Sequence, residues 1–189
     1  VHFKCEHLQH TGSFKYRGAA NAVLGLSDED AAKGVVAHSA GNHGAALAAA
    51  ATARGIRCTV VVPSDTPDAK VANMRRHGAN VVLCEPTQKA RSETAAAEAA
   101  KMGGATLVHP YDDDAVIAGQ GTMALELLEQ CASLDAILVP TSGGGMLTGI
   151  AAAACASRPG IRVIAVEPKG KRLGEALATG ERVVDASTA

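Results

Sequence analysis

The chain has 189 residues, of which 47% are hydrophobic, 20% are charged and only 2% are aromatic, and its formal net charge is −1. This composition predicts one or two soluble globular domains with a core of small aliphatic side chains. The balanced charge and the lack of Trp argue against a nucleic-acid partner. Five cysteines without a paired spacing favour a reducing compartment, and no apolar run reaches the ~18 residues that a membrane span needs.

Short apolar segments alternate with alanine-rich segments along the chain, and this alternation predicts an α/β fold with parallel strands. The first three residues are predicted to belong to a strand, and a helix-prone run follows Lys15. Further strands are predicted at Val35–His38, Thr59–Val62, Asn80–Leu83, Leu107–His109, Ala136–Val139 and Arg162–Val166. Helices are predicted at Asn42–Arg54, Asp68–His77, Thr87–Met102, Asp114–Cys131 and Gly145–Ala156.

The spacing of these segments predicts three parts. Residues 34–111 contain strand–helix units in close succession and are predicted to form a small α/β domain, while residues 1–33 and 112–189 belong to a second body. The chain starts with Val1 rather than Met and ends in the polar segment GERVVDASTA, so we expect a longer natural protein. A cytoplasmic location is expected, and a targeting peptide ahead of Val1 stays open.

Three polar turns precede helix-prone segments and are candidates for ligand binding, since ligands of parallel α/β folds bind beyond the carboxyl ends of the strands. They are the turn around Lys15, the segment HSAGNHGAA at His38–Ala46 and the segment VPTSGGGMLTGIA at Val139–Ala151. In the third turn, backbone N–H groups converge ahead of a helix and would suit a phosphate, although a tight turn needed only for packing is the alternative. The nucleotide patterns GxxxxGK[ST] and GxGxxG are absent from this turn.

The other two turns also have simpler interpretations. Ser39 or Asn42 could cap a helix, His38 or His43 could be core histidines, and Lys15 could lie on the surface. The presence of all three turns in one chain favours a shared cofactor instead. A partly desolvated lysine amine forms a Schiff base with an aldehyde, and an aldehyde that also carries a phosphate needs a glycine-rich site. Pyridoxal phosphate meets both requirements.

Four ordered motifs resemble those of the fold-type II pyridoxal-phosphate enzymes, in the branch of threonine/serine dehydratases and serine racemases. The motifs are KCEHLQHTGSFKYRGA, HSAGNHGAALA, VHPYDDDAVIAGQGTMALEL and VPTSGGGMLTGIA. The resemblance covers essentially the whole chain. It implies two parallel-sheet α/β domains of the tryptophan synthase β-like type, with the large domain incomplete, and it implies a homodimer.

The resemblance also implies roles for single residues. Lys15 corresponds to the Schiff-base lysine, Phe14 to a contact of the cofactor ring and Asn42 to a contact of the ring hydroxyl. The loop that holds the substrate carboxylate corresponds to Ser39, Ala40, Gly41, Asn42 and His43. The phosphate cup corresponds to Gly143, Gly144, Gly145 and Met146, with Ser142 at a position where glycine is usual.

Two departures from the family pattern bear on the activity. Racemases of this branch carry a serine at the position of Ala40, where its hydroxyl is the acid/base opposite the lysine, and a methyl group cannot transfer a proton. The resemblance also implies a divalent cation bound by a glutamate that matches Glu167. The residues at Lys171, Arg172 and Leu173 are poor ligands for a hard cation, so no metal site is expected.

The predicted reaction is a β-elimination that converts L-threonine or L-serine into a 2-oxo acid and ammonia, with 3-hydroxyaspartate as a further candidate. Lys15 would remove the Cα proton, and the β-hydroxyl would leave with the cofactor phosphate as its proton donor. Serine racemase is the alternative enzyme, and a catalytically inactive truncated paralogue is the alternative outside the enzymes. The acidic run at 112–114 is predicted to be a helix cap rather than a metal site.

Overall fold

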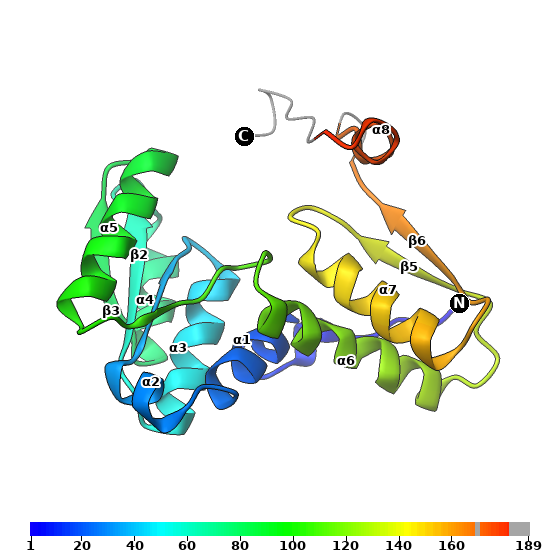
Figure 1. Cartoon of the computed structure of the whole chain (residues 1–189), viewed down its shortest axis with the longest axis horizontal. Helices are drawn as coiled ribbons and strands as arrows, with labels where there is room; N and C mark the ends of the chain where they lie inside the picture. The colour runs from blue at the N-terminus through cyan, green and yellow to red at the C-terminus, as the bar shows by residue number, and fades with distance from the viewer. Residues whose placement is uncertain (169–170, 182–189) are drawn as a thin grey trace.

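The computed structural model describes residues 1–168 and 171–181 and contains two parallel β-sheets flanked by helices (Figure 1). The strands are β1 (Val35–His38), β2 (Cys58–Pro63), β3 (Asn80–Cys84), β4 (Thr106–Leu107), β5 (Ala136–Pro140) and β6 (Arg162–Val166). The helices are the 3₁₀-helix η1 (Glu6–Leu8) and the α-helices α1 (Lys15–Leu24), α2 (Asp28–Lys33), α3 (Asn42–Arg54), α4 (Asp68–Arg76), α5 (Gln88–Lys101), α6 (Asp114–Gln130), α7 (Gly145–Ser157) and α8 (Leu173–Thr179).

The first sheet has the strand order β3-β2-β1-β4, and every pairing in it is parallel. The register places Val35 beside Cys58 on one side and beside Thr106 on the other. The second sheet pairs β5 with β6, again in parallel. The predicted α/β class with parallel strands is therefore confirmed.

Side chains of the first sheet alternate between two helical layers, as the two-residue period of a strand requires. Val35 and Val60 point into the core that β1 and β2 share with α3, whereas Val36 and Val61 pack with α5 on the opposite face. Both faces are covered, which explains why these strands are continuously apolar. Helix α3 is buried nearly all round and ends at Gly55, whose φ of +73° is the left-handed conformation typical of a helix C-terminus.

The second body consists of β5 and β6 with α6 and α7 packed together beside them. The two helices approach closely where Gly121 faces Gly149, since a Cβ on Gly121 would lie 2.8 Å from the Gly149 carbonyl oxygen. Glycine therefore allows the close crossing of α6 and α7 at this point.

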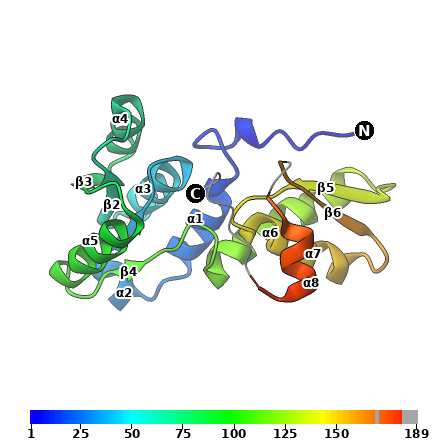
Figure 2. The same cartoon turned by 90° about the horizontal axis from the view of Figure 1, so that it is seen from above.

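Helix α1 joins the two bodies, because it packs against α3 on one side and α6 on the other (Figures 1 and 2). Its crossing with α6 is also made by glycines: a Cβ on Gly119 would lie 2.6 Å from the carbonyl oxygen of Arg17 and 2.7 Å from Cα of Gly18. The N-terminus of α1 thus lies at the junction between the first sheet and the second body.

The structure corrects several sequence-based boundaries. The first three residues are not a strand, and Val1 and Phe3 are largely exposed with no neighbouring strand to pair with. Strand β4 starts one residue earlier and ends two residues earlier than predicted, because its pairing with β1 stops at the Val36–Leu107 pair. Helices α2 and α8 were not predicted, because each is short and largely exposed. Most of the C-terminal segment GERVVDASTA lies outside the described residues, and the three-part division remains a prediction.

Candidate active site

Lys15 is the first residue of α1, and its side chain turns away from solvent. Its Nζ donates a hydrogen bond to the carbonyl oxygen of Pro110 at 2.6 Å and lies 5.1 Å from the centroid of the Phe14 ring. The preceding turn uses Gly12 at a φ of +76°, and the Ser13 side chain is buried. Burial lowers the pKa of the Lys15 amine, because desolvation disfavours the ammonium form. The half-buried side chain and its hydrogen bond to Pro110 favour a site role over a purely solvated position for this lysine.

The glycine-rich loop follows β5 and leads into α7. The N-cap Gly144 has a φ of +91° and supplies no side-chain capping bond, so the first N–H groups of α7 face the loop without a side-chain partner. Gly143 and Gly145 both lie against Tyr111: a Cβ on Gly143 would fall 2.9 Å from Tyr111 Cδ2, and one on Gly145 would fall 2.9 Å from Tyr111 Cα. The lack of space therefore favours glycine at positions 143 and 145, and the positive φ favours it at position 144.

The third predicted loop, from Ser39 to His43, connects β1 to α3. Neither Ser39 nor Asn42 caps α3, because the N-cap is Gly41 and no side-chain capping bond forms. The amide of Gly41 donates to Ser39 Oγ at 3.4 Å, while Ala40 is half-buried and Asn42 is exposed. This loop therefore places the half-buried Ser39, Ala40 and Gly41 and the exposed Asn42 beyond the carboxyl end of β1.

His43 points into the protein rather than toward the loop. Its ring is buried, and its Nε2 donates to the carbonyl oxygen of Val108 at 3.1 Å. Burial, together with the smaller effect of the nearby Lys15 charge, lowers the pKa of His43 to about 4. The core-histidine interpretation fits this side chain, so any contact of His43 with a substrate would come from its backbone.

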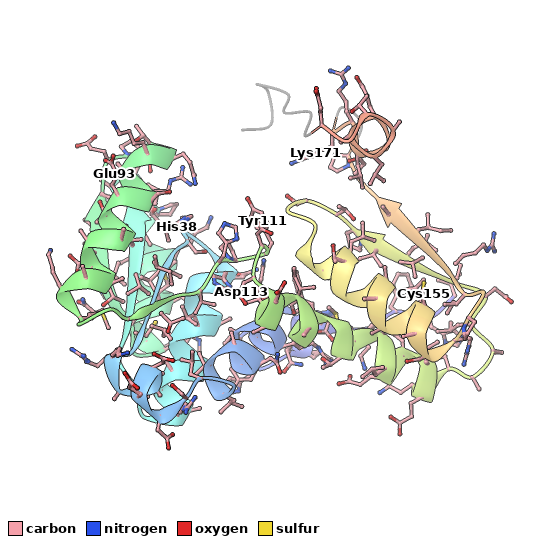
Figure 3. The ribbon with its side chains drawn as sticks, viewed as in Figure 1. His38, Glu93, Tyr111, Asp113, Cys155 and Lys171 are labelled. Atoms are coloured by element: carbon pink, nitrogen blue, oxygen red, sulfur yellow. The ribbon has the colours of Figure 1, made fainter. Side chains whose placement is uncertain are left out.

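The connection from β4 to α6 brings the three loops together. Val108 accepts the His43 hydrogen bond, Pro110 accepts the Lys15 hydrogen bond, and Tyr111 packs on the glycine-rich loop. The ring of His109 stacks edge-on with that of Tyr111, with centroids 4.6 Å apart. Figure 3 shows Tyr111 on this connection, with His38 of β1 nearby. Segments far apart in the sequence thus converge at one short stretch of chain.

These residues fit a cofactor that carries an aldehyde and a phosphate. A partly buried amine with a lowered pKa suits covalent attachment to the aldehyde. The uncapped start of α7 and the glycines before it provide N–H groups for the phosphate, with the positive end of the helix dipole behind them. Phe14 and Met146 border the same apolar cluster beside this space. The site therefore holds the donors that pyridoxal phosphate needs.

Glu167 has a structural partner. Its Oε1 accepts a hydrogen bond from the amide of Leu173 at 2.8 Å and so satisfies one N–H at the start of α8. Within residues 1–168 and 171–181, no three His, Cys, Asp or Glu side chains gather as metal ligands. In the acidic run at 112–114, Asp113 caps α6 by accepting from the Val116 amide at 3.0 Å, as predicted.

Among the described residues, no helix is long and apolar enough to cross a membrane.

Pro110, Tyr111 and Arg17 were not predicted as site residues from the sequence. Pro110 and Tyr111 lie within the motif VHPYDDD, directly after the last strand of the first sheet, and that position was the available signal. Arg17 follows Lys15 by two residues, and its contacts are with residues distant in the chain.

Comparison with known proteins matches the whole chain, residues 1–189, to a family described as "Pyridoxal-phosphate dependent enzyme". A serine racemase of Arabidopsis thaliana is 54% identical over 168 residues, covering 89% of this chain and 50% of that protein. A beta-hydroxyaspartate dehydratase of Paracoccus denitrificans is 52% identical over 167 residues, covering 88% of this chain and 53% of that protein. The solved structure of processed threonine deaminase isoform 2 from Solanum lycopersicum superimposes with a TM-score of 0.89 at 36% identity, covering 95% of this chain and 50% of that one. The chain thus spans about half the length of these relatives.

Proposed function

Because the chain belongs to the fold-type II pyridoxal-phosphate dependent enzymes, we propose that the protein from which it comes catalyses β-elimination of a hydroxy amino acid, releasing a 2-oxo acid and ammonia. The observation that carries the proposal is the convergence at Pro110 and Tyr111. Pro110 accepts a hydrogen bond from the Lys15 amine, and its neighbour Tyr111 packs on the proposed phosphate-binding loop. L-Threonine and L-serine are the proposed substrates, with 3-hydroxyaspartate as a third.

Each group at the site has a stated task in this proposal. Bound pyridoxal phosphate supplies an electron-accepting ring that stabilises negative charge at the substrate Cα. Lys15, whose pKa is lowered by burial, carries the cofactor and then accepts the Cα proton at its Nζ. The loop from Ser39 to His43 binds the substrate carboxylate, and Gly143–Met146 hold the phosphate. Phe14 and Asn42 orient the ring.

Ala40 favours elimination over racemisation. Racemisation needs a proton donor on the face opposite the lysine, and the methyl side chain of Ala40 has no transferable proton. The 52% identical relative named as a dehydratase is consistent with elimination. Serine racemase is the second candidate, since the 54% identical relative carries that name.

The first test is covalent attachment at Lys15. The purified chain is mixed with pyridoxal phosphate, reduced with borohydride, digested and analysed by mass spectrometry, with Lys15→Ala as the control. Stoichiometric labelling of the Lys15 peptide alone is expected. Scattered labelling in this chain and in a version extended to the length of the relatives would favour the inactive paralogue instead.

The second test separates the two enzyme candidates. Release of 2-oxo acid and of D-serine is followed in the extended protein with each proposed substrate, before and after Ala40→Ser. Elimination without D-serine is expected from the native protein, and a gain of D-serine is expected after Ala40→Ser. Failure to release 2-oxo acid from all three substrates would refute the proposed reaction. We also propose a homodimer, which the mass in solution by light scattering would test.

A further inference from the structure

The first turn of α1 carries Lys15 but has little stability of its own. The helix spans ten residues, and its N-cap Phe14 makes no side-chain capping hydrogen bond. Helices of this length are marginal in isolation, and an uncapped first turn frays because its N–H groups lack partners. Tertiary contacts must therefore hold Lys15 in place.

Arg17 makes the most extensive of these contacts, two residues after Lys15. Its Nε and Nη2 donate to the two carboxylate oxygens of Glu6 at 2.8 and 2.9 Å. Its Nη1 and Nη2 donate to the two carboxylate oxygens of Glu126 at 2.6 and 2.8 Å, and Nη1 also donates to Thr122 Oγ1 at 3.0 Å. The Arg17 side chain is 10% exposed. Bidentate pairs of this kind are both strong and directional.

Lys4 balances the charge of this group. Its Nζ lies 2.5 Å from Glu126 Oε2, so two cations and two carboxylates face one another. Hydrogen bonds from Arg17 and then Lys4 lower the pKa of Glu126 to about 2. The network ties the N-terminal segment, α1 and α6 together, and α6 directly follows the connection that contains Pro110. The network therefore links α1, which carries Lys15, to α6, which follows the segment that contains the hydrogen-bond acceptor Pro110.

We propose that Arg17 is a positioning residue for Lys15: its paired contacts with Glu6 and Glu126 hold the first turn of α1 against α6, so that the Lys15 amine stays buried at the Pro110 carbonyl. The inference rests on the proposed function only for the chemical role of Lys15. Without the Arg17 guanidinium, Lys4 would be the remaining cation in the network. The first turn of α1 would then lose its contacts with α6, and water would reach the Lys15 amine. Since burial is what lowers the pKa of Lys15, water would return it toward its ordinary value of 10.5.

Arg54 offers a matched control at the other end of the same helix. Its guanidinium donates to the carbonyl oxygens of Val23 and Leu26, the latter at 2.8 Å, and its side chain is 17% exposed. Arg54→Met therefore removes a similar arginine contact from the C-terminal end of α1. The first turn, with Lys15, keeps all its contacts in this variant.

The experiment measures the reactivity of Lys15 in the cofactor-free chain, so failure of this inference and failure of the proposed function are distinguishable. Each variant is methylated with formaldehyde and a borane reductant at a series of pH values, and mass spectrometry of each lysine peptide gives the pH midpoint of Lys15. We expect Arg17→Met to move this midpoint upward, Arg17→Lys to move it less and Arg54→Met to leave it unchanged. An unchanged midpoint in Arg17→Met, or an equal shift in Arg54→Met, overturns the proposal.

A purely structural role of Arg17 would lower the melting temperature without this selective shift, so melting by circular dichroism is recorded for both variants. His43, the titratable neighbour of Lys15, is neutral throughout the alkaline range because its pKa is about 4. If Arg17→Met does not fold, Glu126→Gln provides the test, because it keeps the volume of the Glu126 side chain and removes its negative charge. A smaller upward shift of the Lys15 midpoint is expected, and no shift overturns the proposal.

Discussion

Replacing Gly143 with alanine should weaken cofactor binding through a clash with one aromatic ring. The added Cβ would lie 2.9 Å from Tyr111 Cδ2 and closer still to Cγ and Cδ1, inside any real carbon contact. The Tyr111 ring cannot withdraw freely, because its edge-on partner His109 stands 4.6 Å away between centroids. Either the ring or the phosphate-binding loop must move. Overpacking of this kind costs about 1–3 kcal/mol, which corresponds to a loss of affinity of roughly 5- to 140-fold.

The assay is a titration of the chain with pyridoxal phosphate, followed by absorbance, that gives a Kd for each variant. Gly174→Ala is the control, since nothing lies within 4 Å of a Cβ at that position in α8 and its φ is not positive. The double variant Gly143→Ala/Tyr111→Ala should recover most of the lost affinity relative to Tyr111→Ala alone, because the clash is then absent. A Kd for Gly143→Ala within twofold of the native chain, or no recovery in the double variant, would refute the reasoning.

Three further predictions concern stability and reactivity. Gly18→Ala should destabilise the chain by about 1–3 kcal/mol in urea unfolding, because its Cβ would collide with the Gln120 side chain where α1 crosses α6, whereas the control in α8 should change little. His43 has a pKa of about 4 in the folded chain against an ordinary 6.5. As the pH falls, His43 is therefore protonated in the unfolded chain at a higher pH than in the folded chain. Stability should therefore fall by on the order of 3 kcal/mol as the pH drops from about 7 to about 4, and His43→Gln should show a smaller loss. Burial raises the pKa of the Cys58 thiol to about 12, so iodoacetamide at pH 8 should label exposed Cys155 and spare Cys58 until the chain is unfolded.

Much of the architecture followed from local patterns. Apolar runs such as the Val-Val-Ala at the start of Val35–His38 predicted buried parallel strands, because a strand covered by helices on both faces needs apolar side chains on both. The interior strands were placed to within a residue or two, while short exposed elements such as α2 and α8 were missed, since neither a buried stripe nor a strong propensity marks them. The strand predicted for the first three residues was wrong for a different reason: apolar composition does not make a strand without a neighbour to pair with.

The chemistry of the candidate site was also readable from residue types. A lysine in a polar turn and a glycine-rich turn before a helix indicated an aldehyde that carries a phosphate, and the ordered motifs indicated the enzyme family. Side-chain direction was not readable. The sequence offered His43 both as a core histidine and as part of the substrate loop. Only the tertiary placement of α3 beside the segment that follows β4 showed that its ring hydrogen-bonds to the carbonyl of Val108.

The sequence alone thus determined the class of fold, the order of the longer helices and of the strands from Val35 onward, and the kind of cofactor, because these depend on periodicity and residue chemistry within short windows. The tertiary structure decided what surrounds Lys15. Pro110, Tyr111 and Glu126 stand 95, 96 and 111 positions from it in the chain, and they reach its helix or the glycine-rich loop only because α1 lies between α3 and α6. Contacts across such distances depend on the packing of whole helices and sheets, and no local pattern in the chain records them.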